Sequence, residues 1–148
     1  MTTSNHVLTG VIIATVVVEP ILVVPLAFVS HFALDSLPHF GYGGDGYGEA
    51  MKHRSVYVIE LLGLIGLLLL VSTGVFGWNI ATLAAIVAVS PDFEWPYRYL
   101  FYERKGLVPP KSPLTNFHQK IQWCEQPWGI YIEIIFFIAG FLLLKSVL

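Results

Sequence analysis

Long apolar runs separated by short polar stretches dominate this chain. The clearest run extends from Val56 to Phe76 and a second from Ile130 to Leu144, and each contains a single charged residue. A helix needs about 20 predominantly apolar residues to cross the core of a bilayer. The second run is preceded by Trp123 and Trp128 and followed by Lys145, and such residues are typical of membrane interfaces. The pattern therefore predicts two membrane-spanning helices.

A shorter apolar segment, Asn79–Ser90, lies between these two runs. It carries small residues at helical spacing, Ala81 and Ala85 on one line and Ala84 and Ala88 on a neighbouring one. Small side chains allow the backbone of a second helix to approach closely. We therefore expect a third helix here, packed tightly against a neighbour.

The N-terminal apolar region allows two interpretations. One is a single span from Val7 to Val29, and the other is a hairpin of two helices, Ser4–Val18 and Pro20–Leu37. Proline disfavours helical geometry in the residue before it and suits the first position of a helix. A charged Glu19 would cost about 2.5–3.5 kcal/mol at the bilayer centre but little at a turn near the interface. These considerations favour the hairpin, whose short arms imply local thinning of the bilayer or a re-entrant position.

The composition agrees with a membrane protein. Hydrophobic residues make up 55% of the 148 residues, charged residues make up 12%, and the mean hydropathy is +0.70. Soluble domains carry about 25% charged residues. The single cysteine, Cys124, excludes an internal disulfide. We expect an all-α, polytopic membrane bundle of about five hydrophobic segments that forms one domain over residues 1–148, with the first two segments a short helical hairpin.

The hairpin interpretation places every histidine on one side of the membrane. The lysines and arginines follow the same distribution, because only Lys145 of the eight lies on the opposite side. By the positive-inside rule this side is cytoplasmic. We therefore expect a multi-pass protein of the inner, cytoplasmic membrane with a cytoplasmic N-terminus. Its basic side chains would attract anionic lipid headgroups, and no nucleic acid is expected as a partner.

The decapeptide Ser30–His39 carries the candidate chemistry. If it is helical, His31 and Asp35 share a face one turn apart, and His39 follows shortly after. Histidine and aspartate are common ligands of zinc and similar divalent ions. Ionisable groups at membrane depth are costly and therefore indicate a functional site. The alternative is that His31 and Asp35 only pair with each other to satisfy a buried helix end.

Further candidate ligands reach the same side of the membrane. Asp92 and Glu94 follow the predicted Asn79–Ser90 helix, and His118 lies in Thr115–Glu125, which has the apolar spacing of an amphipathic interfacial helix. On that helix His118 and Glu125, seven residues apart, would share a face. The predicted metal ligands are therefore His31, Asp35, His39, Asp92, His118 and His6.

Two glutamates, Glu60 and Glu133, lie inside the strongest apolar runs. One interpretation makes such a group a general base that supports a metal-activated water, and the other makes it an interhelical hydrogen-bond partner. In the catalytic interpretation Glu60 or Glu94 would be the base. Three basic side chains on the same side of the membrane would hold an anionic substrate or headgroup: Lys52, Arg54 and Arg98.

Two of these motifs resemble a known family. Ser30–Asp35, with the sequence Ser-His-Phe-Ala-Leu-Asp, and the Pro91–Glu94 element resemble the predicted membrane-bound metal-dependent hydrolases, which are similar to zinc-dependent phospholipase C and to single-strand zinc nucleases. The two motifs occur in the reverse order here, and the family's His-Arg-Gly-x-Thr-His-Ser motif is missing. The resemblance implies a metal-dependent hydrolase in which the metal site draws on His31, Asp35, Asp92, Glu94 and His6.

The expected function is therefore a membrane-embedded metal-dependent hydrolase that acts on a phosphoester or lipid headgroup at the cytoplasmic face, with zinc as the expected ion. A non-enzymatic alternative is a membrane scaffold or an accessory subunit of a larger complex, in which the polar cluster is structural. Membrane lipids are the expected partners, together with a homo-oligomer or a larger membrane complex. Transport is a weaker alternative, because the sequence has no inverted repeat, although Glu60 and Glu133 could transfer protons.

Overall fold

The chain is mostly helical over the residues that the computed structural model describes, which are 1–41, 58, 61–66, 69 and 80–147. The expected all-α class is confirmed for this part of the chain. Most of the predicted Val56–Phe76 span lies outside the described residues. The same holds for three candidate site residues, Glu60, Lys52 and Arg54.

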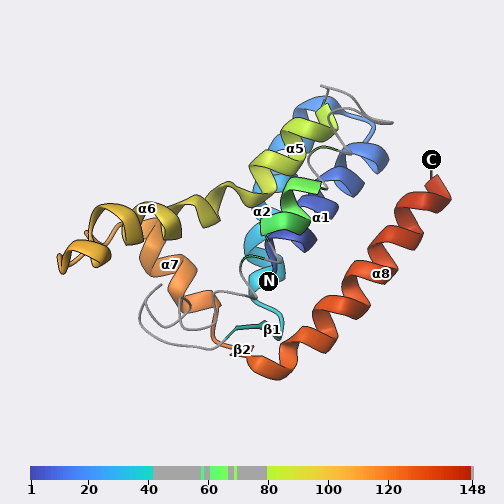
Figure 1. Cartoon of the computed structure of the whole chain (residues 1–148). Coiled ribbons are helices and arrows are strands. Elements are labelled where there is room, and N and C mark those ends of the chain that lie inside the picture. Colours follow the sequence, from blue (N-terminus) through green and yellow to red (C-terminus); the bar gives the residue numbers. More distant parts are fainter. Residues whose placement is uncertain (42–57, 59–60, 67–68, 70–79, 148) are drawn as a thin grey trace.

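The N-terminal region forms two antiparallel helices, α1 (Thr3–Val16) and α2 (Pro20–Asp35) (Figure 1). Glu19 adopts an extended conformation, with φ −87° and ψ 106°, directly before α2. Pro20 then takes the first helical position, where its fixed φ is suitable and its missing N–H costs nothing. These boundaries agree with the hairpin interpretation, and they bring the end of α2 back to the start of α1.

Helix α5 (Ile80–Val89) packs against both arms of this hairpin, at the position predicted from the small residues. The approach to α1 is closest at Gly10, where a Cβ atom would lie 2.5 Å from the carbonyl oxygen of Ala84. No side chain fits in that space, so the glycine permits the contact between the two backbones. The buried small residues of α5 are Ala81, Ala84, Ala85 and Ala88.

Replacing Gly10 by alanine is expected to destabilise the fold by about 1–3 kcal/mol, because the added methyl group forces α1 and α5 apart. Denaturant unfolding in detergent, followed by circular dichroism, measures the change. Gly66→Ala is the matched control, since Gly66 is helical and a Cβ atom there meets nothing within 4 Å. Equal stability of the two variants would contradict the close contact.

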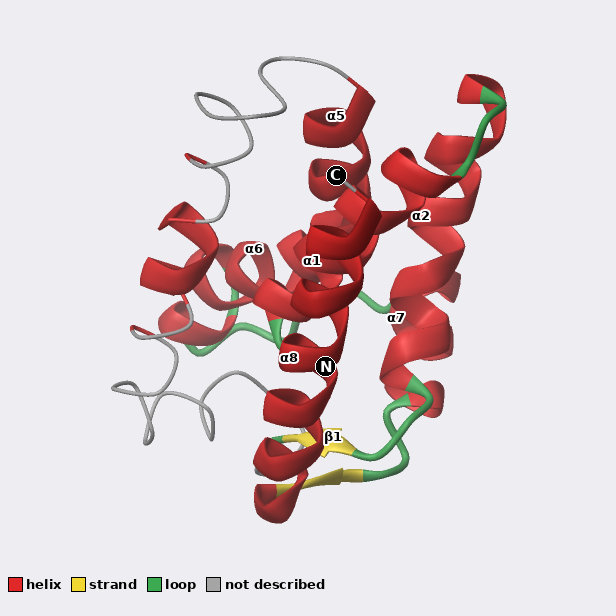
Figure 2. Cartoon of the chain, turned by 90° about the vertical axis from the view of Figure 1, so that its right-hand side faces the viewer, coloured by secondary structure: helices red, strands yellow, loops and turns green. Residues whose placement is uncertain are grey.

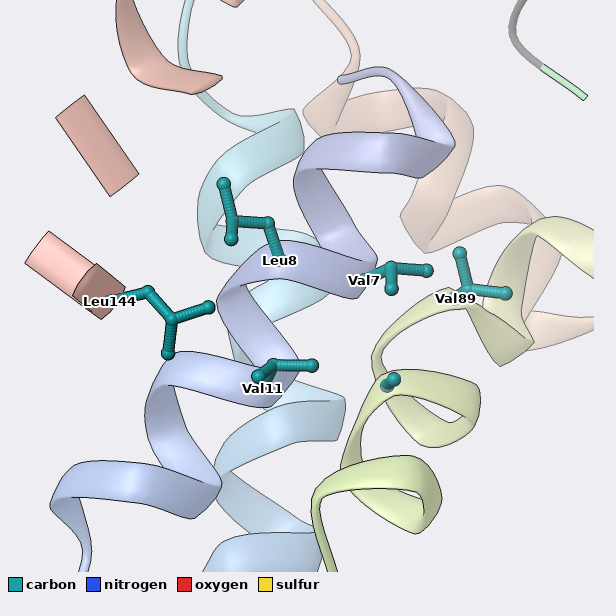
Figure 3. Close-up of a cluster of buried hydrophobic side chains, with 6 residues drawn as sticks. Val7, Leu8, Val11, Val89 and Leu144 are labelled. Carbon is teal, nitrogen blue, oxygen red and sulfur yellow. The ribbon is translucent and has the colours of Figure 1, made fainter. Parts of the chain in front are cut away.

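The hydrophobic core is built around α1. Val7, Leu8 and Val11 of this helix pack with Val89 of α5 and with Leu144 of the C-terminal helix (Figure 3). A second cluster joins α2 to α5 and consists of Val23, Ala27, Ala84 and Ala88. Helix α1 thus holds the other helices together.

The C-terminal helix α8 (Ile130–Val147) confirms the helix predicted over Ile130–Leu144. It lies along α1, on the side away from α2 and α5 (Figures 1 and 2). Together with the preceding 3₁₀ turn η4 (Pro127–Gly129) it is long and apolar enough to cross a membrane, with a mean hydropathy of 2.1. No other helix among the described residues meets that length, although α1 and α2 are also apolar.

A more polar region continues from α5 at the end of the bundle where α2 stops (Figure 1). It contains the 3₁₀ turn η2 (Ser90–Phe93), helix α6 (Glu94–Phe101), the 3₁₀ turn η3 (Glu103–Lys105) and helix α7 (Pro113–Ile121).

Beyond α7 the chain returns to the end of α2. Strand β2 (Glu125–Gln126) pairs in parallel with β1 (His39–Phe40), which follows α2. Because α7 ends at Ile121 and Glu125 lies in β2, the predicted helical face shared by His118 and Glu125 is wrong. The pairing instead ties the segment after α7 to the segment after α2.

Helix α7 begins with a capping box. The hydroxyl of Ser112 accepts a hydrogen bond from the backbone N–H of Thr115 at 3.0 Å, and the Thr115 hydroxyl accepts one from the Ser112 N–H at 3.3 Å. This arrangement satisfies two donors that would otherwise lack partners at the helix start. It also fixes the position at which α7 begins.

Replacing Ser112 by alanine is expected to lower stability by about 1 kcal/mol, the usual effect of losing an N-cap hydroxyl. Chemical denaturation in detergent measures the loss. Ser146→Ala is a suitable control, because that exposed hydroxyl bonds only within the last turn of α8. A capping variant as stable as this control would show that the box does not hold α7.

Candidate metal centre

Four of the predicted ligands converge where α2 ends. His31 and Asp35 come from α2, Asp92 from η2 and His118 from α7. Each offers one ligand atom, and all four atoms lie within 4.8 Å of one another. The side chains of His31, Asp35 and His118 are fully buried, and that of Asp92 is partly buried. These four residues, here called the His–Asp cluster, could hold a metal ion.

The distances within the His–Asp cluster are compatible with coordination of one small ion. The Nε2 atom of His31 lies 3.1 Å from Nε2 of His118, 3.2 Å from Oδ2 of Asp35 and 3.6 Å from Oδ1 of Asp92. The Nε2 atom of His118 lies 2.7 Å from the same oxygen of Asp35 and 4.0 Å from that of Asp92. Ligand atoms around tetrahedral zinc are about 3.3 Å apart, since each bond is about 2.0–2.1 Å long.

His31 is oriented by a backbone group. Its Nδ1 atom lies 2.8 Å from the carbonyl oxygen of Ala88 in α5, which can only accept a hydrogen bond. Nδ1 must therefore carry a proton, and in the neutral ring Nε2 presents a lone pair toward Asp35. A lone pair that faces a carboxylate is unfavourable unless a cation or a proton lies between them. Such backbone orientation is common for histidines that bind metals.

His118 presents the same nitrogen to the cluster, but its other nitrogen has no acceptor. Nδ1 is buried without a hydrogen-bond partner among the described residues, whereas Nε2 lies 2.7 Å from Oδ2 of Asp35. Without an ion, the ring proton is therefore favoured on Nε2, where it is donated to Asp35. An ion at the cluster would take the Nε2 lone pair, so the proton of the neutral ring would have to move to Nδ1, which has no acceptor among the described residues.

Asp35 is contacted on both of its oxygens. Oδ2 faces His31 and His118, while Oδ1 contacts the amino nitrogen of Met1 and lies 3.1 Å from Nε2 of His6. The carboxylate therefore has more partners than the simple His31–Asp35 pair considered from the sequence. It occupies the centre of the polar groups that gather at this end of the bundle.

His6 lies beside the cluster and outside the group of four. Its ring stacks on that of His31, with centroids 4.0 Å apart and an interplanar angle of 22°. Both of its nitrogens are buried without a hydrogen-bond partner among the described residues. His6 therefore approaches Oδ1 of Asp35, whereas His118 approaches Oδ2.

Asp92 differs from the other members because it comes from a 3₁₀ turn rather than from a long helix. Its burial raises the pKa of the carboxyl group to about 6, since desolvation disfavours the charged form. The nearby carboxylate of Asp35 acts in the same direction, whereas His31 opposes it. A cation bound at the cluster would favour the ionised form of Asp92.

Two predicted site residues point to other partners. His39 is buried in β1, and its Nδ1 donates to the carbonyl oxygen of Leu37 at 2.7 Å. Glu94 accepts a hydrogen bond from the hydroxyl of Thr115. Neither residue belongs to the group of four that could hold one ion.

The ring of Trp95 lies between Arg98 and His118 of the cluster. The guanidinium group of Arg98 stands 5.4 Å from the ring centroid of Trp95, and that ring lies 5.7 Å from the ring of His118. Arg98 is almost fully buried, and its Nη1 is 3.9 Å from Oε1 of Glu94. The Nε and Nη1 atoms have no hydrogen-bond partner among the described residues.

Glu133 joins three segments by hydrogen bonds. Its carboxylate accepts from the backbone N–H and hydroxyl of Thr2, at 2.8 and 2.6 Å, and from the amide of Asn5 at 2.6 Å. It also accepts from the backbone N–H of Phe40 at 3.2 Å. These contacts correspond to the structural interpretation of Glu133 as an interhelical hydrogen-bond partner.

The sequence analysis did not identify Gln122 as a site residue. Its Nε2 atom lies 3.3 Å from Oδ2 of Asp35 and 3.3 Å from Nε2 of His118. Its position four residues after His118 could have indicated this contact, because residues four apart on a helix lie on the same face. Gln122 directly follows the last turn of α7 and keeps that relation to His118.

The described residues thus contain a buried cluster of imidazoles and carboxylates that could hold a metal ion, at one end of a helical bundle. Comparisons of the chain with protein-family models, with curated proteins and with solved structures found no match.

Proposed function

We propose that this chain is a membrane-embedded metal-dependent hydrolase whose His–Asp cluster holds a divalent ion, with zinc as the expected metal. The observation that carries the proposal is the convergence of four ligand atoms from three separate segments. The orientation of His31 by a backbone carbonyl supports it, since its free nitrogen then faces the cluster. The resemblance of two motifs to membrane-bound metal-dependent hydrolases points to the same chemistry.

The residues of the cluster would each have a simple role. His31, His118, Asp35 and Asp92 would bind the ion, and His6 would bind or orient the Asp35 carboxylate at its Oδ1 atom. When bound, such an ion activates a water molecule and polarises a phosphoryl oxygen. The proposed substrate is a phosphoester or a lipid headgroup. Arg98, whose buried guanidinium has unpartnered nitrogens, would hold the anion together with Lys52 and Arg54.

A general base is also needed, and Glu94 and Glu60 are the proposed residues. Glu94 lies within reach of Arg98 and accepts a hydrogen bond from Thr115, which would keep its carboxylate in a fixed position. Substitution of either glutamate by glutamine should lower turnover without removing the metal. Lower turnover with the metal still bound distinguishes a general base from a metal ligand, whose loss would also remove the metal.

A membrane setting supports a lipid substrate. The one described helix long enough to span a bilayer is only 17% buried within the structure, so it exposes a largely apolar surface. The region that supplies His118 also exposes aromatic side chains, including Phe101 and Phe117, beside the basic Lys105 and Lys120. Such a combination is typical of the membrane interface. We therefore propose a multi-pass inner-membrane protein with a cytoplasmic N-terminus and a site at headgroup level.

Elemental analysis of the detergent-purified protein tests the metal site. The wild type should contain a near-stoichiometric divalent metal, and the His31→Ala/Asp35→Ala double variant should lack it while keeping its helical circular dichroism. Release of phosphate-containing headgroups from vesicles would then be measured for both. A folded wild type without metal would overturn the proposal.

One observation favours a second, non-enzymatic function. The outer surface of α8 exposes large apolar side chains such as Ile135 and Leu142, which are 68% and 60% exposed. Such a helix could contact a second copy of the chain or a larger membrane complex, as expected of a scaffold or accessory subunit. This function predicts stable co-purification with a membrane partner and no metal after gentle purification.

A further inference from the structure

Gln122 is placed differently from the four members of the His–Asp cluster. It follows helix α7 and is half-buried, and its backbone N–H donates to the carbonyl oxygen of His118 at 3.3 Å. Its side-chain amide then reaches back to the cluster, where it lies 3.3 Å from one atom of Asp35 and from one atom of His118. Those two atoms are both candidate metal ligands.

An amide nitrogen cannot coordinate a metal ion, because it carries two hydrogens and no available lone pair. Its equal distance from Oδ2 of Asp35 and Nε2 of His118 nevertheless places it at the edge of the space between them. If both of these atoms bind an ion, Nε2 of His118 has no lone pair left, whereas Oδ2 of Asp35 can still accept from one of the two amide hydrogens of Gln122. The second amide hydrogen would then need another acceptor at the same edge of the cluster.

We infer that this acceptor is an oxygen of an anion held beside the ion, and that Gln122 is an anion-binding residue of the site. This inference rests on the proposed function, because the ion must be present for the anion to bind there. A neutral donor suits the position, since it binds a phosphoryl oxygen without repelling a cation. Preorganised donors of this kind stabilise negative charge effectively in sites that exclude water.

The inference can be tested with cobalt(II) in place of the native ion and inorganic phosphate as the probe. The visible absorption of cobalt reports both its own binding and the entry of phosphate beside it. Gln122→Ala should still bind cobalt, and at a cobalt concentration that saturates both proteins it should bind phosphate about tenfold more weakly than the wild type, the effect expected for one lost hydrogen bond. Gln122→Glu should weaken phosphate binding further, because the added negative charge repels the anion.

Gln119→Ala is the matched control, since Gln119 lies on the exposed side of the same helix. It should bind cobalt and phosphate as the wild type does. Equal phosphate affinity in Gln122→Ala and the wild type would overturn the inference, as would a wild type that binds cobalt but no phosphate. Loss of cobalt from Gln122→Ala would also overturn it, because the side chain would then act as a ligand through its oxygen.

The proposed function fails separately, at an earlier step. If the folded wild type shows no cobalt absorption at all, the His–Asp cluster does not hold an ion, and the role of Gln122 is overturned together with it. If cobalt binds to the wild type and is lost on substitution of His31, the metal site stands whatever the result for Gln122.

Discussion

Replacing Asp35 by asparagine should lower the affinity of the chain for zinc or cobalt by about 100-fold or more. Loss of a residue that only orients a ligand already costs about 10–100-fold in metal affinity, and Asp35 is proposed to be a ligand itself. Asparagine keeps the volume of the side chain but removes the charge that faces His31, His118 and His6. Competition titration against a chromophoric chelator in detergent measures the change.

Glu19→Gln provides the control for this experiment. Glu19 is exposed at the turn between α1 and α2, so its substitution removes one carboxylate without touching the His–Asp cluster. Its metal affinity should equal that of the wild type. Wild-type affinity in a folded Asp35→Asn variant would contradict the assignment of Asp35 as a ligand.

Replacing Glu133 by alanine should lower the free energy of unfolding by about 3 kcal/mol or more. The substitution removes the shared acceptor of Thr2, Asn5 and Phe40, and each buried donor left unpaired costs about 1–3 kcal/mol. The same carboxylate connects the start of α1, strand β1 and helix α8. Denaturant unfolding in detergent, monitored by circular dichroism, measures the loss.

Two controls separate the hydrogen bonds from general effects on α8. Glu133→Gln keeps one acceptor oxygen and should show an intermediate loss, whereas truncation of the exposed Ile135 should change the stability little. Metal binding in folded Glu133→Gln should persist, because Glu133 is not one of the four cluster residues. Unchanged stability of Glu133→Ala would show that these hydrogen bonds do not hold the helices together.

Local patterns sufficed to predict most of the helices. The Glu19-Pro20 pair indicated the break between α1 and α2, because proline restricts the conformation of the residue before it. The apolar runs predicted α5 and α8 to within a few residues. The end of α7 was not predicted, since apolar spacing continued to Cys124 while the chain left the helix after Ile121 to pair β2 with β1. That pairing joins residues far apart in the sequence, and no local pattern reports it.

Within the candidate site, the sequence alone placed His31 and Asp35 together, because residues four apart on a helix share a face. It also identified Asp92 and His118 as candidates by residue type, but not their distances from the pair. Three residues needed the tertiary structure to be interpreted. Glu133 accepts hydrogen bonds from backbone and side-chain donors of other segments, and Glu94 accepts one from the hydroxyl of Thr115. The side chain of Gln122 contacts the His–Asp cluster, a contact that the sequence analysis did not predict.

Short-range spacing and composition sufficed to predict the helical class and the chemical type of the groups available for a metal, and they favoured the hairpin over a single span. Which of those groups meet depends on how the helices pack. Their convergence depends on Gly10 and the small residues of α5, which let the backbones of α1 and α5 come close, and on the return of α7 to the end of α2. Contacts between distant segments arise from packing of the whole bundle, and packing is not encoded in any single stretch of the chain.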